Sequence, residues 1–139
     1  MILCVSTIIG CSSPPNNTSP TWTSQKSPVS DQVPLACICG TSSTDVFAVG
    51  GQGTIIHYDG NMWSGMTSGT TYPLLGVWGS SSSNVYVVGS GGLILHYDGN
   101  TWSNMPNGTT SHLFGVWGSS SSDVFAVGDQ GIILHYSKK

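Results

Sequence analysis

Short apolar runs alternate with glycine- and serine-rich segments along residues 37–139. The apolar runs are four or five residues long and rich in β-branched and aromatic side chains, which favour strands over helices. Glycine pairs and Asp-Gly-Asn sequences between them indicate tight turns. Within one unit the pattern predicts four strands, at about 75–79, 85–88, 93–97 and from 101.

The unit recurs at a fixed interval. His57, His96 and His135 each follow the last by 39 residues, in the same sequence context. A period of this length is typical of stacked or radial repeat architectures. The strand at 124–127 is apolar on both faces, as expected for a sheet sandwiched between neighbouring sheets. We therefore predict an all-β fold of β-propeller blades, each with four antiparallel strands, with a β-trefoil as the alternative.

The repeats divide the chain into three parts. Residues 1–11 are a short apolar segment, residues 12–34 are a Ser/Pro/Thr-rich linker, and residues 35–139 contain the propeller repeats. The predicted units are 37–75, 76–114 and 115–139.

A segment near Trp22 resembles the fourth strand of a unit, because Pro-Thr-Trp-Thr-Ser matches the sequence around Trp102. The unit 115–139 shows only the first three strands. We interpret the Trp22 segment as a closing strand that completes the last blade. Three blades are fewer than the four to eight of most propellers, so we expect either a homo-oligomer that completes a ring or a fragment of a longer propeller.

The sequences at 115–128 and 131–136 resemble the bacterial BNR/YCF48-like propeller repeats. The resemblance implies a WD40/YVTN/BNR-like propeller of the kind common in secreted or surface proteins of bacteria. The Asp-box of that family is only approximated, because Asp98 and Trp102 lie four residues apart rather than five. Sialidase activity does not follow from the resemblance, since it requires an arginine cluster and this chain has no arginine.

The N-terminal segment resembles the end of a bacterial lipoprotein signal. Its apolar run ends at Ile-Ile-Gly-Cys, and the match makes Cys11 the acylated residue. The resemblance implies an outer-membrane lipoprotein, or a periplasmic or extracellular protein, attached to a membrane only through a lipid anchor. The basic segment expected at the start of such a signal is absent.

Charge is sparse along the whole chain. Only 6% of residues are charged, and the formal net charge is −3. Such a surface does not attract phosphate backbones, so we expect no nucleic-acid partner.

Four tryptophans at repeat positions are candidate ligand-binding residues, because aromatic faces stack on sugars: Trp63, Trp78, Trp102 and Trp117. Their place inside strands also suits packing between blades. Both roles stay open at this point, with packing favoured.

The repeated histidines do not predict a metal site. Equivalent positions in successive blades are related by rotation, so we expect hydrogen-bonded structural histidines and no metal. Asp45, Asn84 and Asp123 share one repeat position after the serine turns, where they are expected to cap those turns. Cys37 and Cys39 are expected to be small buried apolar residues.

No catalytic motif is present in the sequence, and symmetric repeats argue against an active site, so we expect no enzyme and no cofactor. The prediction is a non-catalytic binding or scaffolding repeat protein at the cell surface, whose ligand is a protein or a glycan. The alternative is a fragment of a larger sialidase-like or lyase-like propeller enzyme.

Overall fold

A computed structural model describes residues 19–138 of the chain. The predicted acylation at Cys11 and the segment 1–11 lie outside the described residues. The described part is built from β-strands and three short 3-10 turns, and none of its helices is long and apolar enough to cross a membrane.

The strands form three antiparallel sheets in simple meander order. The first sheet contains β1 (Leu35–Ser42), β2 (Asp45–Gly50), β3 (Ile55–Tyr58) and β4 (Trp63–Met66). The second contains β5 (Leu74–Ser81), β6 (Asn84–Gly89), β7 (Ile94–Tyr97) and β8 (Trp102–Asn104), and the third contains β9 (Leu113–Ser120), β10 (Asp123–Gly128) and β11 (Ile133–Ser137).

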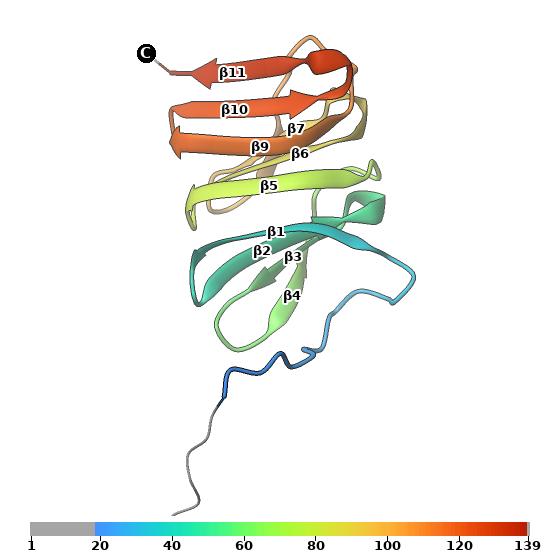
Figure 1. Ribbon diagram of the computed structural model, residues 1–139, viewed down its shortest axis with the longest axis vertical. Helices are drawn as coiled ribbons and strands as arrows, with labels where there is room; N and C mark the ends of the chain where they lie inside the picture. Colours follow the sequence, from blue (N-terminus) through green and yellow to red (C-terminus); the bar gives the residue numbers. More distant parts are fainter. Residues whose placement is uncertain (1–18, 139) are drawn as a thin grey trace, which may run out of the picture.

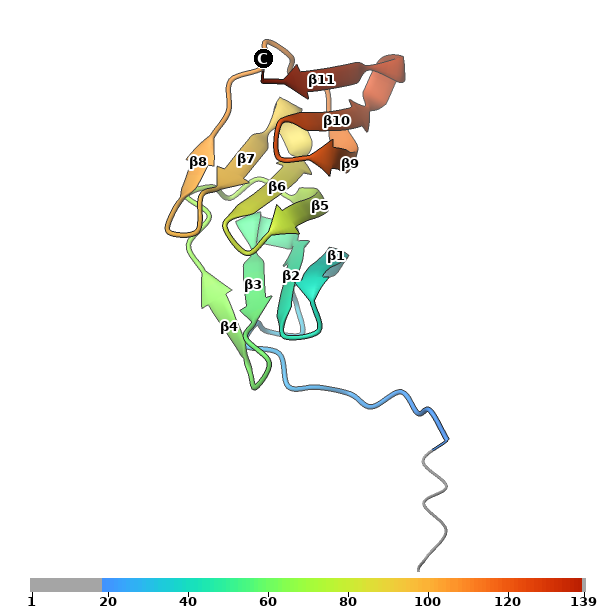
Figure 2. The ribbon, with the colours of Figure 1, turned by 90° about the vertical axis from the view of Figure 1, so that its left-hand side faces the viewer.

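The sheets pack face against face as successive blades (Figure 1). Along one edge of the stack, the first strand of the second blade, β5, contacts the first strands of its neighbours, β1 and β9, whereas β4 and β8 lie on the opposite edge (Figure 2). Four-stranded meander blades of this kind confirm the predicted all-β propeller architecture over the trefoil. The first strand of each blade begins two residues before the predicted unit.

The connection between the second and third strands of each blade is a 3-10 turn: η1 (Gly51–Gly53), η2 (Ser90–Gly92) and η3 (Asp129–Gly131). Each turn needs two consecutive residues with positive φ, for example Gly91 at 69° and Gly92 at 74°. The second of these residues is glycine in all three turns and adopts this conformation without strain, whereas the first is glycine in the second blade and glutamine in the other two.

The core lies between the blades. At the junction of the first two blades, Phe47 from β2 meets Tyr97 and Trp102 of the second blade, with ring centroids 6.1 and 6.3 Å apart. The central strand β6 is buried on both faces, because Val85 and Val87 face the first blade while Tyr86 and Val88 face the third. This agrees with the prediction for the repeat, but β10, the strand on which the prediction was made, is covered by described residues on one face only, and Val127 there is 46% exposed.

Cys37 and Cys39 lie on one face of β1 and pack against the same core. Neither thiol forms a disulfide within the described residues. They are half-buried rather than fully buried, because β1 forms the edge of its blade.

The segment predicted as a closing strand is not a strand in this structure. Residues 19–27 have no strand pairing, and the side chain of Trp22 is fully exposed. The segment lies beside the first blade, at the end of the stack opposite β11 (Figure 1). Among the described residues the third blade has three strands, and its completion in a closed ring stays a prediction.

Candidate functional site

Each blade contains a histidine bound to the residue that follows its serine turn. In the first blade, Nε2 of His57 lies 2.6 Å from Oδ1 of Asp45. His96 lies 2.8 Å from Asn84 Oδ1 in the second blade. These contacts, and the equivalent pair in the third blade, confirm the expectation of hydrogen-bonded histidines.

The same three residues also hold the turn between the first two strands, as predicted. The Asp45 carboxylate accepts a hydrogen bond from the Thr41 hydroxyl, and Asp123 accepts one from Ser119. Asn84 instead donates its amide to Ser80 Oγ, at 2.7 Å. One side chain therefore ties the first turn of the blade to its third strand.

This arrangement places a hydroxyl, a carboxylate and an imidazole together, but in the wrong order for nucleophilic catalysis. In a serine hydrolase the imidazole lies between the hydroxyl and the carboxylate and takes the hydroxyl proton. Here the carboxylate of Asp123 lies between Ser119 and His135 and contacts both. Because the hydroxyl donates to the carboxylate, no base is placed to activate it. The cluster therefore links the first turn of the blade to its third strand.

The electrostatics of the tie differ between blades. Burial lowers the pKa of His96, and the more distant Asp98 opposes this only in part. Its direct partner is the uncharged Asn84, so the neutral imidazole is favoured. In the third blade, hydrogen bonds from Ser119 and His135 lower the pKa of Asp123.

Metal ligands do not gather within the described residues: no group of three or more His, Cys, Asp or Glu side chains lies close enough together to hold an ion.

The four candidate tryptophans do not form one site. Trp78 stacks on Tyr86 and its ring lies against Gly118 of the next blade. Trp102 stacks on Tyr97 and contacts Phe47, so it packs between the first two blades.

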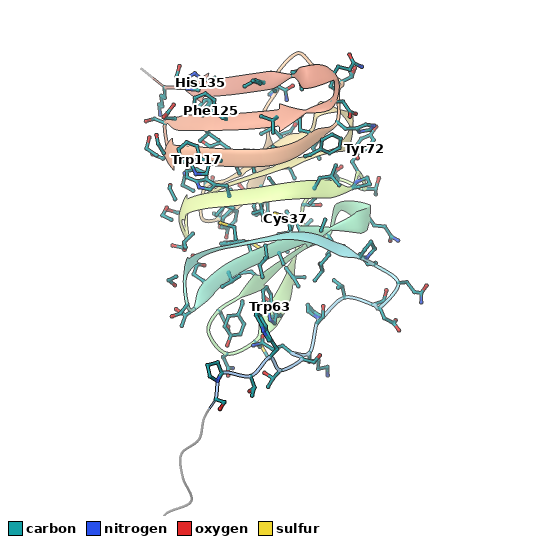
Figure 3. The ribbon with its side chains drawn as sticks, in the orientation of Figure 1. Cys37, Trp63, Tyr72, Trp117, Phe125 and His135 are labelled. Carbon is teal, nitrogen blue, oxygen red and sulfur yellow. The ribbon has the colours of Figure 1, made fainter. Side chains whose placement is uncertain are left out.

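Trp63 and Trp117 lie on the outer faces of different blades (Figure 3). Trp63 contacts Tyr58 and donates its indole N–H to Gln25 Oε1, at 2.7 Å. Trp117 is 59% exposed on the third blade. The four rings therefore do not form a single sugar-stacking platform.

The loops at one end of the blades form a second candidate site, which we call the loop face. It consists of the 3-10 turns together with the segments 67–73 and 105–112, which lead from one blade to the next. Two hollows lie on it, of about 720 and 340 Å³, and both are lined by Tyr72. The ring of Tyr72 is 59% exposed and lies beside Gly91.

The segments of the loop face are held by local hydrogen bonds. The hydroxyls of Ser68 and Thr70 accept from the backbone N–H of Thr70 and Tyr72, at 3.4 and 3.1 Å. Asn107 donates its side-chain amide to Gly92 O at 2.7 Å. Such short-range bonds fix the loop conformation before any ligand arrives.

The loop face was not found from the sequence. Tyr72 lies between the predicted strands, and Ser111 occupies the same position in the next repeat. Only this difference between the two repeats could have identified Tyr72 from the sequence.

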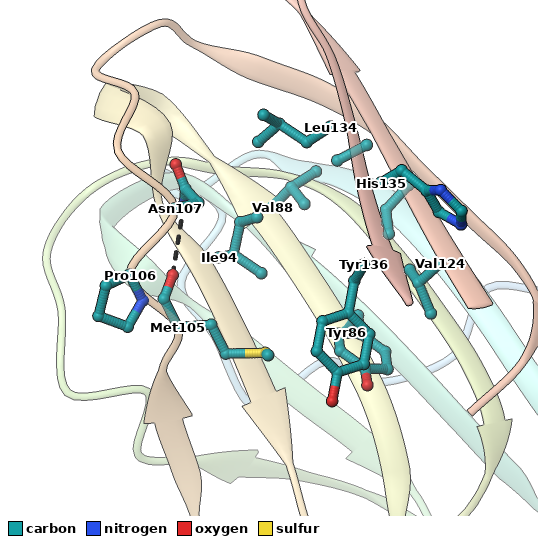
Figure 4. Close-up of a pocket in the computed structure, with 12 residues that line it drawn as sticks. Tyr86, Val88, Ile94, Met105, Pro106, Asn107, Val124, Leu134, His135 and Tyr136 are labelled. Atoms are coloured by element: carbon teal, nitrogen blue, oxygen red, sulfur yellow. Dashed lines mark hydrogen bonds between the residues drawn. The ribbon is translucent and has the colours of Figure 1, made fainter. Parts of the chain in front are cut away.

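An apolar cavity of about 250 Å³ lies between the second and third blades (Figure 4). Tyr86, Tyr136 and Leu134 line it together with Met105 at the outer end. The tyrosine rings are 6.0 Å apart, and the Tyr86 hydroxyl donates to Ser121 O across the junction.

No family model and no curated protein matches the sequence. Two solved structures are similar in fold. The structure of YCF48 bound to D1 peptide has a TM-score of 0.66 and 17% sequence identity to this chain. The superposed region covers 76% of this chain and 38% of the YCF48 chain. YCF48 from Cyanidioschyzon merolae has a TM-score of 0.68 and 18% sequence identity to this chain. The superposed region covers 80% of this chain and 40% of the YCF48 chain. The chain thus spans about two fifths of the length of these proteins and shares their β-propeller fold.

Proposed function

We propose that this chain is a non-catalytic protein-binding module that takes an extended, uncharged peptide segment on its loop face. The observation that carries the proposal is Tyr72, whose exposed ring forms a wall of both hollows. Rigid, exposed tyrosines are frequent anchors of protein recognition, because they bury a large area and lose little conformational entropy.

The surroundings of Tyr72 support a peptide partner. Its neighbours are mostly glycine, serine and threonine, which leave backbone N–H and C=O groups accessible. The hollows contain no charged lining residue, so affinity there depends on packing and neutral hydrogen bonds. One solved structure with the same fold is that of YCF48 bound to D1 peptide.

Selection from a random peptide library displayed on phage tests the proposal. We expect enriched peptides to bind the wild-type chain and to bind Tyr72→Ala at least about tenfold more weakly, as for an interface anchor. Raising the salt concentration is expected to change the affinity little.

Met62→Ala is the matched control, since Met62 is also 59% exposed but lies in the turn between β3 and β4, outside both hollows. Peptides that bind Tyr72→Ala as tightly as wild type would refute the loop-face site. A glycan array with clear binding, alongside a peptide selection without enrichment, would refute a protein partner.

We also propose that the module is exported and anchored through acyl-Cys11. Metabolic labelling with an alkyne fatty acid in a bacterial host is expected to label the wild-type chain and not Cys11→Ser. Equal labelling of both chains, or of neither, would contradict the anchor.

A further inference from the structure

The two junctions between blades are built from equivalent residues, displaced by 39 positions. Phe47 and Ile55 of the first junction correspond to Tyr86 and Ile94 of the second. Likewise Tyr97 corresponds to Tyr136.

One member of the first junction has no counterpart at the second. Trp102 fills the space beside Phe47 and Tyr97, with ring centroids 6.3 and 4.9 Å away. Among the described residues nothing stands in the equivalent place beside Tyr86 and Tyr136, and the 250 Å³ cavity lies there (Figure 4). The cavity is thus lined by the repeat equivalents of residues that surround Trp102 at the first junction.

The edge of β11 that borders this cavity is open. In the described chain β11 pairs with β10 alone, whereas β7, its equivalent, pairs with β6 and β8. An open strand edge exposes unpaired N–H and C=O groups and favours the addition of another strand.

The segment 20–24 matches the strand that is needed. Its sequence, Pro-Thr-Trp-Thr-Ser, aligns with Asn-Thr-Trp-Ser-Asn at 100–104. Trp22 itself is fully exposed, so the described residues do not bury its apolar ring.

The segment also lies on the correct side of its own first blade. Trp22 lines an open hollow together with Ile38, Ala48 and Ile56. The repeat equivalents of these three residues are Val116, Ala126 and Leu134, which line the cavity between the second and third blades together with residues 105–107. Residues 20–24 therefore lie on the face of the first blade that a preceding blade would cover.

We propose that a second copy of this chain docks head to tail on the third blade and supplies residues 20–24 as its fourth strand. Trp22 of the second copy fills the cavity beside Tyr86 and Tyr136. Its first blade then covers the outer face of the third, with Trp63 over Phe125 as Trp102 lies over Phe47. The described parts of two copies together contain six blades, within the range that closes a propeller ring.

The two faces that would meet are apolar and are exposed in the single chain. On the third blade, Ile133 is 70% and Val127 46% exposed, and on the first blade Ile38 is 63% exposed. The described ionisable groups on the third blade's outer face are Asp123 and His135, which bind each other. The association is therefore expected to persist at high salt.

The mass of the 139-residue chain in solution tests the proposal. We expect sedimentation to give twice the 14.5 kDa of one chain, with Trp22→Ala weakening association at least about thirtyfold, as for an interface anchor. Tyr72→Ala, which removes an exposed aromatic elsewhere, is the control and should leave the dimer intact. A monomer at all accessible concentrations, or an unchanged dimer in Trp22→Ala, would overturn the proposal.

A cysteine pair tests the register. In the second blade His96 pairs with Ser103, so His135 is predicted to pair with Thr23 of the second copy. Directly opposed strand residues are close enough for a disulfide. Thr23→Cys with His135→Cys should form a crosslinked dimer on a non-reducing gel, whereas Thr23→Cys with Tyr72→Cys should not. Equal crosslinking in the two pairs would refute the register.

Discussion

The backbone contact at Gly89 gives the sharpest test of the packing between strands. Gly89 is buried at the end of β6, and a methyl group added to it would lie 2.3 Å from Pro73 O. The same carbonyl accepts a hydrogen bond from Ser90 N–H at 3.0 Å. Gly89→Ala must therefore push apart two backbone segments that are hydrogen-bonded to each other.

The expected cost follows from these contacts. Ordinary van der Waals contact begins at 3.4 Å, so the methyl and the carbonyl must separate by about 1 Å. Overpacking a well-filled site costs about 1–3 kcal/mol, and weakening the bond to Ser90 adds about 1 kcal/mol. We expect Gly89→Ala to lower the free energy of unfolding by about 2–4 kcal/mol.

Gly65→Ala is the matched control, because Gly65 lies in β4 and a methyl group there meets nothing within 4 Å. It should stabilise the fold slightly, by about 0.4–1 kcal/mol, through the unfolded chain. Urea unfolding followed by tryptophan fluorescence, at one protein concentration for all chains, measures both effects. A free energy of unfolding for Gly89→Ala within about 0.5 kcal/mol of wild type would refute this account of the packing.

Three further substitutions test the ties within and between blades. Asn84→Asp gives His96 a carboxylate partner and should raise the pKa of that imidazole, measured by NMR titration; a pKa unchanged or lowered would contradict the pairing. Backbone hydrogen bonds lower the pKa of Asp98, so its stabilising effect is present at neutral pH and is lost as the pH falls below about 4. Asp98→Asn keeps an acceptor for the turn and should reduce the fall in thermal midpoint between pH 5 and 3, whereas a fall as steep as in wild type would argue against this role. Tyr86→Phe removes the hydrogen bond to Ser121 O and should lower the free energy of unfolding by about 1 kcal/mol, measured in urea; no loss would mean that this bond does not hold the blades together.

The blade architecture was predictable because its signals are local. Glycines such as Gly92 stand where the chain needs positive φ, and strands that are apolar on both faces indicated a sheet covered on each side, which holds for β6 in the middle of the stack. Each signal lies within one unit and is repeated in the next, so a departure in one copy does not hide it.

Contacts between strands were harder to predict. The tie between Asp45 and His57 joins residues 12 positions apart and depends on the register of β2 and β3, in which Phe47 pairs with His57. The spacing recurs in all three units, but only the register shows that it brings the side chains together. The separation of Trp63 from Trp117 likewise depends on the order in which the blades stack.

The repeat also explains why the ends of the stack differ from its middle although their sequences are alike. Phe125 occupies the position of Phe47, which is 2% exposed because the second blade covers it. On the third blade no described segment provides that cover, so residues selected for burial, such as Ile133, are exposed. A chain with so few charges has little to keep two such faces apart, and apolar patches favour association.

Association at these faces leaves the loop face free, because Tyr72 lies at the ends of the blades rather than on their flat sides. The two proposals therefore fail separately. Trp22→Ala should weaken the dimer and keep peptide binding, whereas Tyr72→Ala should keep the dimer and weaken peptide binding. If Trp22→Ala also abolished peptide binding, the loop face would depend on the completed ring, and the peptide site would have to extend across the junction between the two copies.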